Sequence, residues 1–224
     1  MYCAIIGDIV KSRTIVERSE AQVKLNNILN DVNSIFSEDI ESKFIITLGD
    51  EFQGLLNTPI HLLKIIDYIK MNFEWSNIRF GVGFGEMQTE IRAQAIGSDG
   101  PAYHVARKAI ENIKEEQKRN KKESVTRDIL IYGQTNGNRA LYTAINTAIS
   151  LCNVIENEWS EKQFEVINEM EFTDQTQREI AQKLQVTQSS IQRRLVTSNY
   201  FSYRNAKETL QEIIMDVWED QNEL

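Results

Sequence analysis

The most restrictive feature of the sequence is a strand-like run at residues 78–87, IRFGVGFGEM, with glycine at every second position from Gly81 to Gly85. Successive side chains of a β-strand point to opposite faces, so one face of this strand carries no side chains along the glycine row. Something must approach the backbone closely there. We therefore expect either a helix or a ligand to pack directly against this face.

Around this strand, short β-rich runs alternate with amphipathic helical segments. Strands are predicted at residues 2–10, 43–48, 52–56, 78–87 and 128–132, and helices at 20–36, 60–73 and 101–117. The first run, YCAIIGDIV, is almost continuously apolar, which is typical of a central strand covered on both faces. The order β, α, β, β, α, β, followed by one more α and β, predicts the α+β class: a ferredoxin-like sheet with its helices on one face, an arrangement that nucleotide-handling palm domains share with many other ferredoxin-like folds.

Helix ends and domain limits follow from the same patterns. Ser19 is expected to cap helix 20–36, whose apolar stripe includes Val23 and Ile35. Thr58 and Pro59 are expected to begin helix 60–73. From about residue 135 the pattern is helical only. The predicted division is therefore a palm domain at 1–134 and an all-α domain at 135–224, with a boundary near 134–138.

Composition indicates which cellular compartment to expect for the chain. Its 224 residues carry a formal net charge of -8, and its two cysteines, Cys3 and Cys152, lie far apart in sequence. They provide neither a disulfide framework nor a four-ligand zinc site, which favours a reducing compartment. The N-terminus lacks the basic region and long apolar stretch of a signal peptide, and the longest apolar runs are strand-sized. We expect a soluble cytoplasmic protein with no membrane partner. The net negative charge argues against sequence-independent binding along nucleic acid.

A pair of aspartates is placed for metal chemistry. Asp8 ends the first strand, and Asp50, followed by Glu51, lies at the tip of the hairpin that should pair beside it. Carboxylates from adjacent strand ends suit Mg²⁺ or Mn²⁺, with Glu51 as a possible third ligand. Alternatively, Asp8 caps a following turn and Asp50 occupies an ordinary Gly-Asp hairpin position.

Four segments resemble known motifs in the same order. GDIVKS at residues 7–12 and ITLGDEF at 46–52 are similar to the two metal motifs of class III nucleotidyl cyclases, and the second is also similar to the diguanylate cyclase signature. IRFGVGFGE at 78–86 and AIGSDGPAYHVARK at 95–108 resemble the cyclase strand, loop and helix that carry the transition-state residues. Over nearly its whole length the chain is identified as a member of the SatD family, with a cyclase-like domain before a helical part.

This resemblance implies roles for individual residues. Asp8 and Asp50 would be metal ligands, and Glu51 an accessory ligand. Arg107 would stabilise charge on the transferring phosphate, because a guanidinium can meet phosphate oxygens bidentately. Tyr103 stands where the cyclases have an asparagine, which counts against cyclisation. Further candidates for nucleotide contact are the backbone from Ile9 to Ser12, Lys11, Arg13, Asp99 as a reader of the base or a helix cap, and the basic run 118–122 (KRNKK).

The helical half contains a second signal. Residues 176–196 have the spacing of a helix-turn-helix, with Gln185 where a turn glycine is common, and residues 178–204 carry a net charge of +4. At the start of the second helix, side chains suited to base edges or phosphates are Gln188, Ser189, Ser190, Gln192, Arg193 and Arg194. The alternative is a packing unit of three helices that binds protein.

Together these signals favour a nucleotide-responsive DNA-binding regulator with a Mg²⁺-dependent, cyclase-like nucleotide-binding domain. Its nucleotide would be ATP or GTP, which the sequence does not resolve. Two alternatives stay open: an active nucleotidyl cyclase or nucleotidyl transferase, and a non-catalytic adaptor that binds protein. Because class III cyclases often complete their site between two subunits, the resemblance also implies a homodimer.

Overall fold

A computed structural model describes residues 1–119, 127–134 and 138–222. Residues 120–122 of the basic run and residues 135–137 of the predicted boundary lie outside them. In the described part, five strands form one sheet in the order β2-β3-β1-β4-β5. The strands are β1 (Tyr2–Ile9), β2 (Ile40–Leu48), β3 (Glu51–Leu56), β4 (Ile78–Gly85) and β5 (Ile129–Gly133). Neighbours are antiparallel except β4 and β5, which are parallel. The α+β class and the predicted strands are confirmed.

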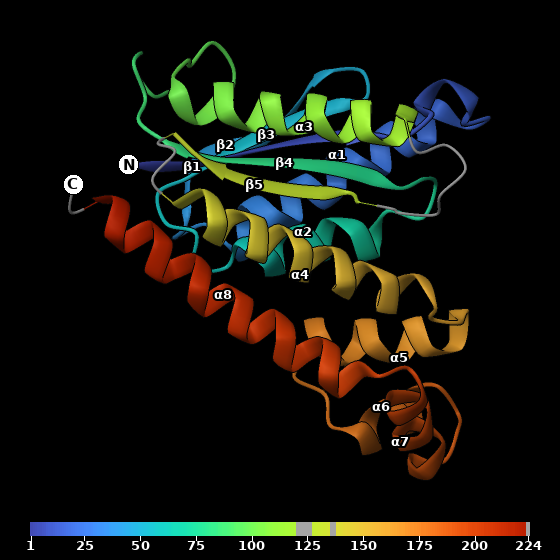
Figure 1. Cartoon of the computed structure of the whole chain (residues 1–224). Coiled ribbons are helices and arrows are strands. Elements are labelled where there is room, and N and C mark those ends of the chain that lie inside the picture. Colours follow the sequence, from blue (N-terminus) through green and yellow to red (C-terminus); the bar gives the residue numbers. More distant parts are fainter. Residues whose placement is uncertain (120–126, 135–137, 223–224) are drawn as a thin grey trace.

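The helices surround the sheet in layers (Figure 1). Their bounds are α1 (Arg18–Ile35), α2 (Leu62–Asn72), α3 (Pro101–Arg119), α4 (Arg139–Asn157), α5 (Glu161–Phe172), α6 (Gln177–Lys183), α7 (Gln188–Thr197) and α8 (Tyr200–Asn222), with a short 3-10 turn η1 (Ser12–Thr14). One core cluster joins α1, α2, α4 and α8 to one face of the sheet. A second cluster joins α3 to the opposite face. The prediction that all helices of the palm lie on one face is therefore wrong.

The glycine row explains why α3 takes the other face. A Cβ atom at Gly81 would lie 2.1 Å from the Ala106 carbonyl oxygen, and one at Gly83 would lie 2.2 Å from the Ala102 carbonyl oxygen. The backbone of α3 therefore rests directly on bare strand, with small alanines at the contact. The sequence predicted either a helix or a ligand against this face, and the structure places a helix there.

Alternation along β1 separates the two sides of the core. Cys3, Ile5 and Ile9 belong to the cluster shared with α1 and α2, whereas Ala4 and Ile6 belong to the cluster shared with α3. Asp8 continues the second row, and it lies opposite Glu51 of β3 and Arg79 of β4 in the two registers. The first strand thus delivers a carboxylate to the α3 side of the sheet.

Two expected helix starts are wrong. The residue before α1 is Glu17 and the residue before α2 is His61, and neither helix has a side-chain cap from Ser19 or Thr58. The predicted stripe of α1 also includes too many residues, because Val23 is 63% exposed and Ile35 is 58% exposed. Residues 28, 29 and 32 follow Leu25 at helical spacing and are buried with it on one face of α1. Residues 23 and 35 lie off this face.

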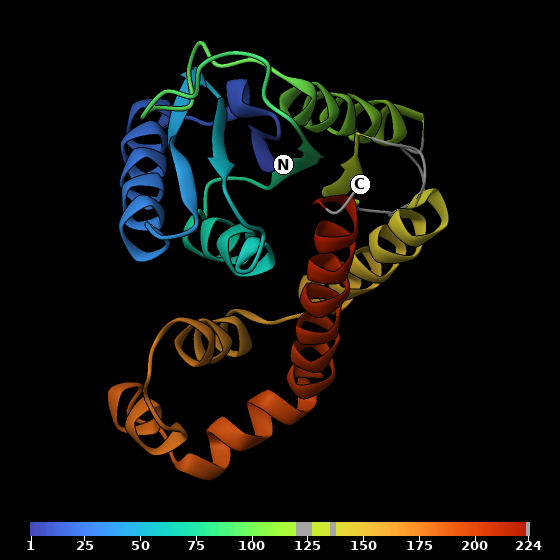
Figure 2. The ribbon, with the colours of Figure 1, turned by 90° about the vertical axis from the view of Figure 1, so that its left-hand side faces the viewer.

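The C-terminal helices divide between two cores. Residues of α4 and α8 join the main cluster beneath the sheet, while α5, α6 and α7 share a separate small cluster with Tyr200 at the start of α8. Figure 2 shows α5–α7 at one end, with α8 running from them back toward the sheet. The division at residue 134 stays a prediction. Within the described residues, no helix combines the length and the apolar character needed to cross a membrane.

Candidate functional site

The end of β1 and the β2–β3 turn form one polar corner. The Ile9 amide donates to the Asp50 carbonyl oxygen at 3.0 Å, which fixes the hairpin tip against the first strand. The Ser12 hydroxyl donates to the Asp50 carboxylate at 2.5 Å. Lys11, just before η1, adopts a left-handed backbone with φ 52°, which turns the chain sharply after the strand. The proximity of Asp8 and Asp50 follows from the pairing of β1 with β3, in which Asp8 lies opposite Glu51.

Two cations hold the Asp8 carboxylate. The Arg79 guanidinium approaches one oxygen at 2.6 Å, and the Lys114 ammonium approaches the other at 2.8 Å. Only 10% of the Asp8 side chain is exposed, against 16% for Arg79 and 37% for Lys114. Asp8 is therefore an ion-paired carboxylate, with both of its oxygens engaged from β4 and α3.

Glu51 is engaged in the same way by a different residue. Both Arg107 terminal nitrogens donate to its two carboxylate oxygens, at 3.1 Å and 3.0 Å. This is the bidentate geometry that a guanidinium uses for carboxylates and phosphates alike. Arg107, which was predicted to contact phosphate, is thus paired with Glu51, which was predicted to bind a metal ion.

Tyr103 and Asp99 lie outside this corner. Tyr103 packs into the cluster under α3, where its hydroxyl is buried without a hydrogen-bond partner, and burial raises its pKa well above the ordinary tyrosine value. Asp99 lies in the loop before α3, and its exposed carboxylate is 2.8 Å from His104 Nε2. Neither residue lines the hollow described next.

A hollow of about 250 Å³ opens at the corner between β1 and η1. Its lining brings together six of the predicted residues and adds two cations, giving Asp8, Ile9, Lys11, Ser12, Arg13, Asp50, Arg79 and Lys114. Four cationic side chains face two carboxylates, so the lining has a formal charge of +2. Such a lining attracts anions more than cations.

This arrangement does not fit a divalent metal ion. Mg²⁺ needs free oxygen ligands, but both oxygens of Asp8 and both of Glu51 are bound by cationic side chains. In the described part of the chain, no group of three His, Cys, Asp or Glu side chains could hold a metal ion. The predicted Mg²⁺ or Mn²⁺ site stays a prediction, and the side chains as placed give it no ligand set.

Arg79 and Lys114 were missed by the sequence analysis, although both had a signal. Arg79 shares the strand face of Gly81 and Gly83, which is the face that α3 covers. Lys114 lies seven residues after Arg107, two turns further along the same side of α3. Extending the helical period beyond Arg107 would have found Lys114. The register that places Arg79 opposite Asp8 depends on strand pairing and has no local signature.

The second candidate surface is the exposed side of α7. Thr187 caps this helix, with its hydroxyl accepting from the Ser190 amide, and Ile191 and Leu195 are buried against α5 and α6. The side chains of Gln188, Ser189, Gln192 and Arg193 are exposed.

Three of the six predicted DNA contacts are engaged within the protein, and one of them is the exposed Ser189, whose hydroxyl lies 2.9 Å from the Thr187 hydroxyl. The Ser190 hydroxyl lies 2.9 Å from the Thr187 hydroxyl. One terminal nitrogen of Arg194 lies 4.0 Å from a Glu165 carboxylate oxygen and donates to the Lys162 carbonyl oxygen at 3.4 Å.

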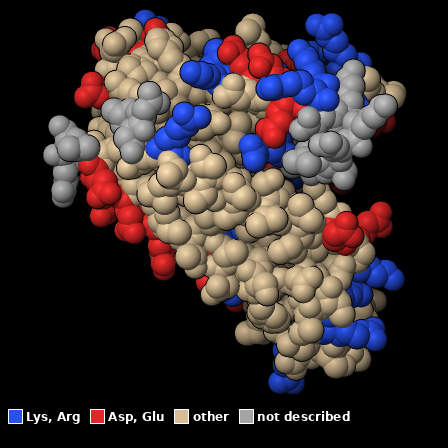
Figure 3. Space-filling model, in the orientation of Figure 1, with Lys and Arg blue, Asp and Glu red and all other residues tan. Residues whose placement is uncertain are grey.

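The turn between α6 and α7 accommodates the missing glycine. Gln185 adopts φ 53°, a left-handed conformation that glycine takes without strain. Figure 3 shows Lys and Arg side chains at the lower end of the molecule, over α6 and α7. Arg178 and Arg193 are exposed there, whereas Lys183 is paired with Glu169 at 2.6 Å.

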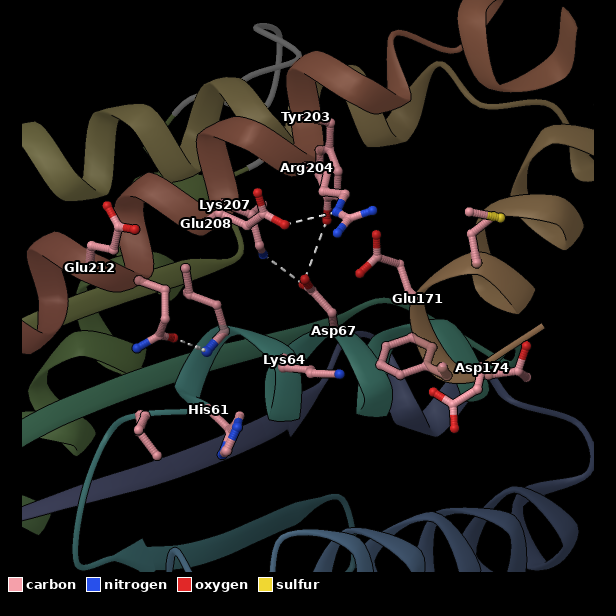
Figure 4. Close-up of a pocket in the computed structure, with 16 residues that line it drawn as sticks. His61, Lys64, Asp67, Glu171, Asp174, Tyr203, Arg204, Lys207, Glu208 and Glu212 are labelled. Carbon is pink, nitrogen blue, oxygen red and sulfur yellow. Dashed lines mark hydrogen bonds and ion pairs between the residues drawn. The ribbon is translucent and has the colours of Figure 1, made fainter. Parts of the chain in front are cut away.

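A larger cavity of about 530 Å³ lies between α2, the end of α5, and α8 (Figure 4). Asp67 points from α2 toward Lys207 of α8, with 2.7 Å between the ion-pair atoms, and toward the Tyr203 hydroxyl at 3.5 Å. Burial raises the pKa of Asp67, opposed by the Lys207 charge. This cavity had no sequence signal, because it arises from the docking of helices far apart in the chain.

Comparisons with known proteins add a family. No curated protein matches this chain. Among solved structures, the crystal structure of the guanylyl cyclase Cya2 is similar to it with a TM-score of 0.36 and 14% sequence identity, covering 50% of this chain and 69% of the cyclase. The SatD family matches residues 2–214, nearly the whole chain. The chain therefore belongs to the SatD family.

Proposed function

We propose that this protein is a nucleotide-responsive DNA-binding regulator, in which the hollow beside β1 receives the phosphates of a nucleotide. The observation that carries the proposal is the charge of that hollow. Lys11 and Arg13 are exposed at its rim, and neither has an ion-pair partner among the described residues. Unpaired cations beside a backbone turn are suited to phosphate oxygens.

The DNA-binding part of the proposal rests on α7. Its apolar side is closed against α5 and α6, while Gln188, Gln192 and Arg193 face solvent. Amide and guanidinium groups at the start of a helix are the groups that read base edges in the major groove. The +4 charge of residues 178–204, in a chain of net charge -8, supports contact with phosphates by this segment only.

Any coupling between the two surfaces would have to pass through α8 and then across the sheet, because α8 packs on the face opposite the hollow. This helix begins three residues after the end of α7 and reaches the core beneath the sheet. The Lys207–Asp67 ion pair joins it to α2. Nucleotide binding would change DNA affinity only if the nucleotide binds two arrangements of α8 with different affinity.

Nucleotide binding is tested by isothermal titration of the full chain with ATP and with GTP. The Lys11→Gln, Arg13→Gln double variant should bind at least about tenfold more weakly, because two charge-assisted contacts are lost. The control is Lys108→Gln, which removes an exposed charge of α3 outside the hollow. Equal affinity of wild-type and double variant would refute the placement of the phosphates.

DNA binding is tested by selecting a duplex from a random pool and measuring its affinity with and without nucleotide. Arg193→Ala should weaken binding by about 1–3 kcal/mol if the side chain contacts a base. Lys108→Gln, again, should leave affinity unchanged. Failure to enrich any sequence, in folded protein that binds nucleotide, would favour the adaptor hypothesis for the helical part.

The alternative of an active nucleotidyl cyclase or transferase needs Arg107 to leave Glu51. Mass spectrometry of ATP and GTP incubations, with Asp8→Asn as control, tests it. A cyclic or linear product that is lost in the variant would make the protein an enzyme. The expected result is unchanged nucleotide. The homodimer stays a prediction, to be tested by light scattering with and without nucleotide.

A further inference from the structure

The Asp8 carboxylate, at the end of β1, resembles a metal ligand in one respect, because positive charge contacts both of its oxygens. Here that charge comes from Arg79 and Lys114, which approach Asp8 at 2.6 Å and 2.8 Å. Both cations line the hollow. Their positions are fixed by the register of β1 with β4 and by the close seat of α3 on the glycine row.

We propose that the hollow binds a polyphosphate anion without a divalent metal ion, with Lys114 and Arg79 supplying the charge that a metal would otherwise supply. The inference rests on the proposed nucleotide site and concerns how that site works. The ligand class is a nucleoside triphosphate or inorganic pyrophosphate, which share the same chemistry. In this view Asp8 is a positioning residue that holds two cations.

Donor counting supports this role. A lysine ammonium has three donors, and one of those of Lys114 goes to Asp8. A guanidinium has five, of which Arg79 gives one to Asp8 and one, from Nε, to Gln117 at 2.8 Å. Each cation therefore keeps donors for phosphate oxygens while it holds Asp8.

The other carboxylates support the same conclusion. Asp50 accepts from Ser12 at 2.5 Å, and Glu51 is bound by Arg107 away from the hollow. A metal ion would have to displace several charge-assisted contacts before it gained its ligands. A polyphosphate would displace none and would find a lining of charge +2. Because Mg²⁺ neutralises part of the triphosphate charge, it should weaken this attraction.

The test is isothermal titration of the full-length protein with ATP, GTP and pyrophosphate, each in excess EDTA and in excess Mg²⁺. We expect binding in EDTA that is as tight as in Mg²⁺ or tighter. Lys114→Gln should lose at least about tenfold in affinity under EDTA, while Lys108→Gln should match wild type. Lys114 is 37% exposed, and circular dichroism and the urea midpoint verify that the variant is folded.

The outcomes separate the two proposals. Binding that requires Mg²⁺ would overturn the metal-free site and leave the nucleotide-binding proposal standing. Binding of neither nucleotide nor pyrophosphate under any condition would overturn both. Binding of pyrophosphate alone would support the metal-free site and reassign its ligand. Metal-free binding that is insensitive to Lys114→Gln would place the anion elsewhere and refute the inference.

Discussion

Lys70 of α2 forms a buried ionic junction whose removal should destabilise the fold. Its ammonium lies 2.9 Å from Asp128, 3.0 Å from Glu156 and 3.3 Å from the Asn153 side-chain oxygen. Exposure is 12% for the lysine side chain, 18% for Asp128 and 13% for Glu156. The junction ties α2 to the start of β5 and to α4. Lys70→Met removes the cation and leaves two mostly buried carboxylates facing each other.

The expected cost of Lys70→Met is about 3–5 kcal/mol in the free energy of unfolding, the usual effect of removing one partner from a buried ion pair. With a urea m-value of about 3 kcal/mol/M, the unfolding midpoint should fall by roughly 1–1.7 M. The control Glu208→Gln breaks the exposed pair with Arg204, whose side chains are 59% and 50% exposed, and should cost less than about 0.5 kcal/mol. Equal midpoints for the two variants would show that the Lys70 junction does not stabilise the fold.

The dependence on pH has a definite sign. Burial would lower the pKa of Lys70, but Glu156, Asp128 and Asp67 outweigh it and raise the pKa well above the ordinary lysine value. A lysine whose pKa is raised in the folded state stabilises the fold fully at pH values below its pKa in the unfolded state. This stabilisation is lost only as pH rises through the pKa of the folded state. The stabilisation is therefore complete at neutral pH.

Acid should reduce the penalty of Lys70→Met. Burial already raises the pKa of Asp128 above 3.8 despite the Lys70 charge, and losing that charge raises it further. The folded variant then binds protons that the unfolded chain does not, so its stability relative to wild type rises as pH falls toward that pKa. Urea titrations at pH 7 and pH 5 measure the difference. A penalty that grows in acid would contradict this assignment.

Three further predictions concern the glycine row, the α6–α7 turn and a buried thiol. Gly83→Ala should destabilise by about 2 kcal/mol or more in urea unfolding, because the new Cβ would lie 2.2 Å and 2.5 Å from backbone atoms of α3, and an unchanged midpoint would show that α3 is loosely seated. Gln185→Gly should stabilise by about 0.5–1 kcal/mol, because glycine takes φ 53° without strain, and a lower melting temperature would contradict this. Cys3 is fully buried and burial raises its pKa, so it should react with a disulfide reagent only as fast as the protein unfolds; rapid labelling of native protein would oppose the fold.

The sheet was largely predictable because its signals are local. The apolar run of β1, the Gly49–Asp50 turn and the alternating glycines of β4 each define a strand or a turn within a few residues. These signals also predicted the proximity of Asp8 and Asp50. Helix starts were less predictable, since Ser19 and Thr58 are good capping residues in sequence but the chain enters each helix at a different residue.

The helical period of α3 could have identified Lys114 as a cation on the side of Arg107, but no local pattern predicted that Lys114 or Arg79 would pair with Asp8. Arg79 lies 71 residues from Asp8 in sequence and meets it through the register of β1 with β4, and Lys114 lies 106 residues from Asp8 and meets it from α3. The same limit applies to Arg107, whose residue type predicted a phosphate contact while its actual neighbour is Glu51. A motif specifies which groups are available, and the packing of α3 decides what each of them contacts.

The most direct test of phosphate binding beside β1 is a crystal structure of the full chain with a non-hydrolysable triphosphate, grown with EDTA and again with Mg²⁺. Phosphates are expected in the hollow beside β1, contacting Lys11, Arg13 and Lys114, in both crystals. A triphosphate in the cavity between α2 and α8, or one bound by Asp8 and Asp50 through a metal ion, would contradict it.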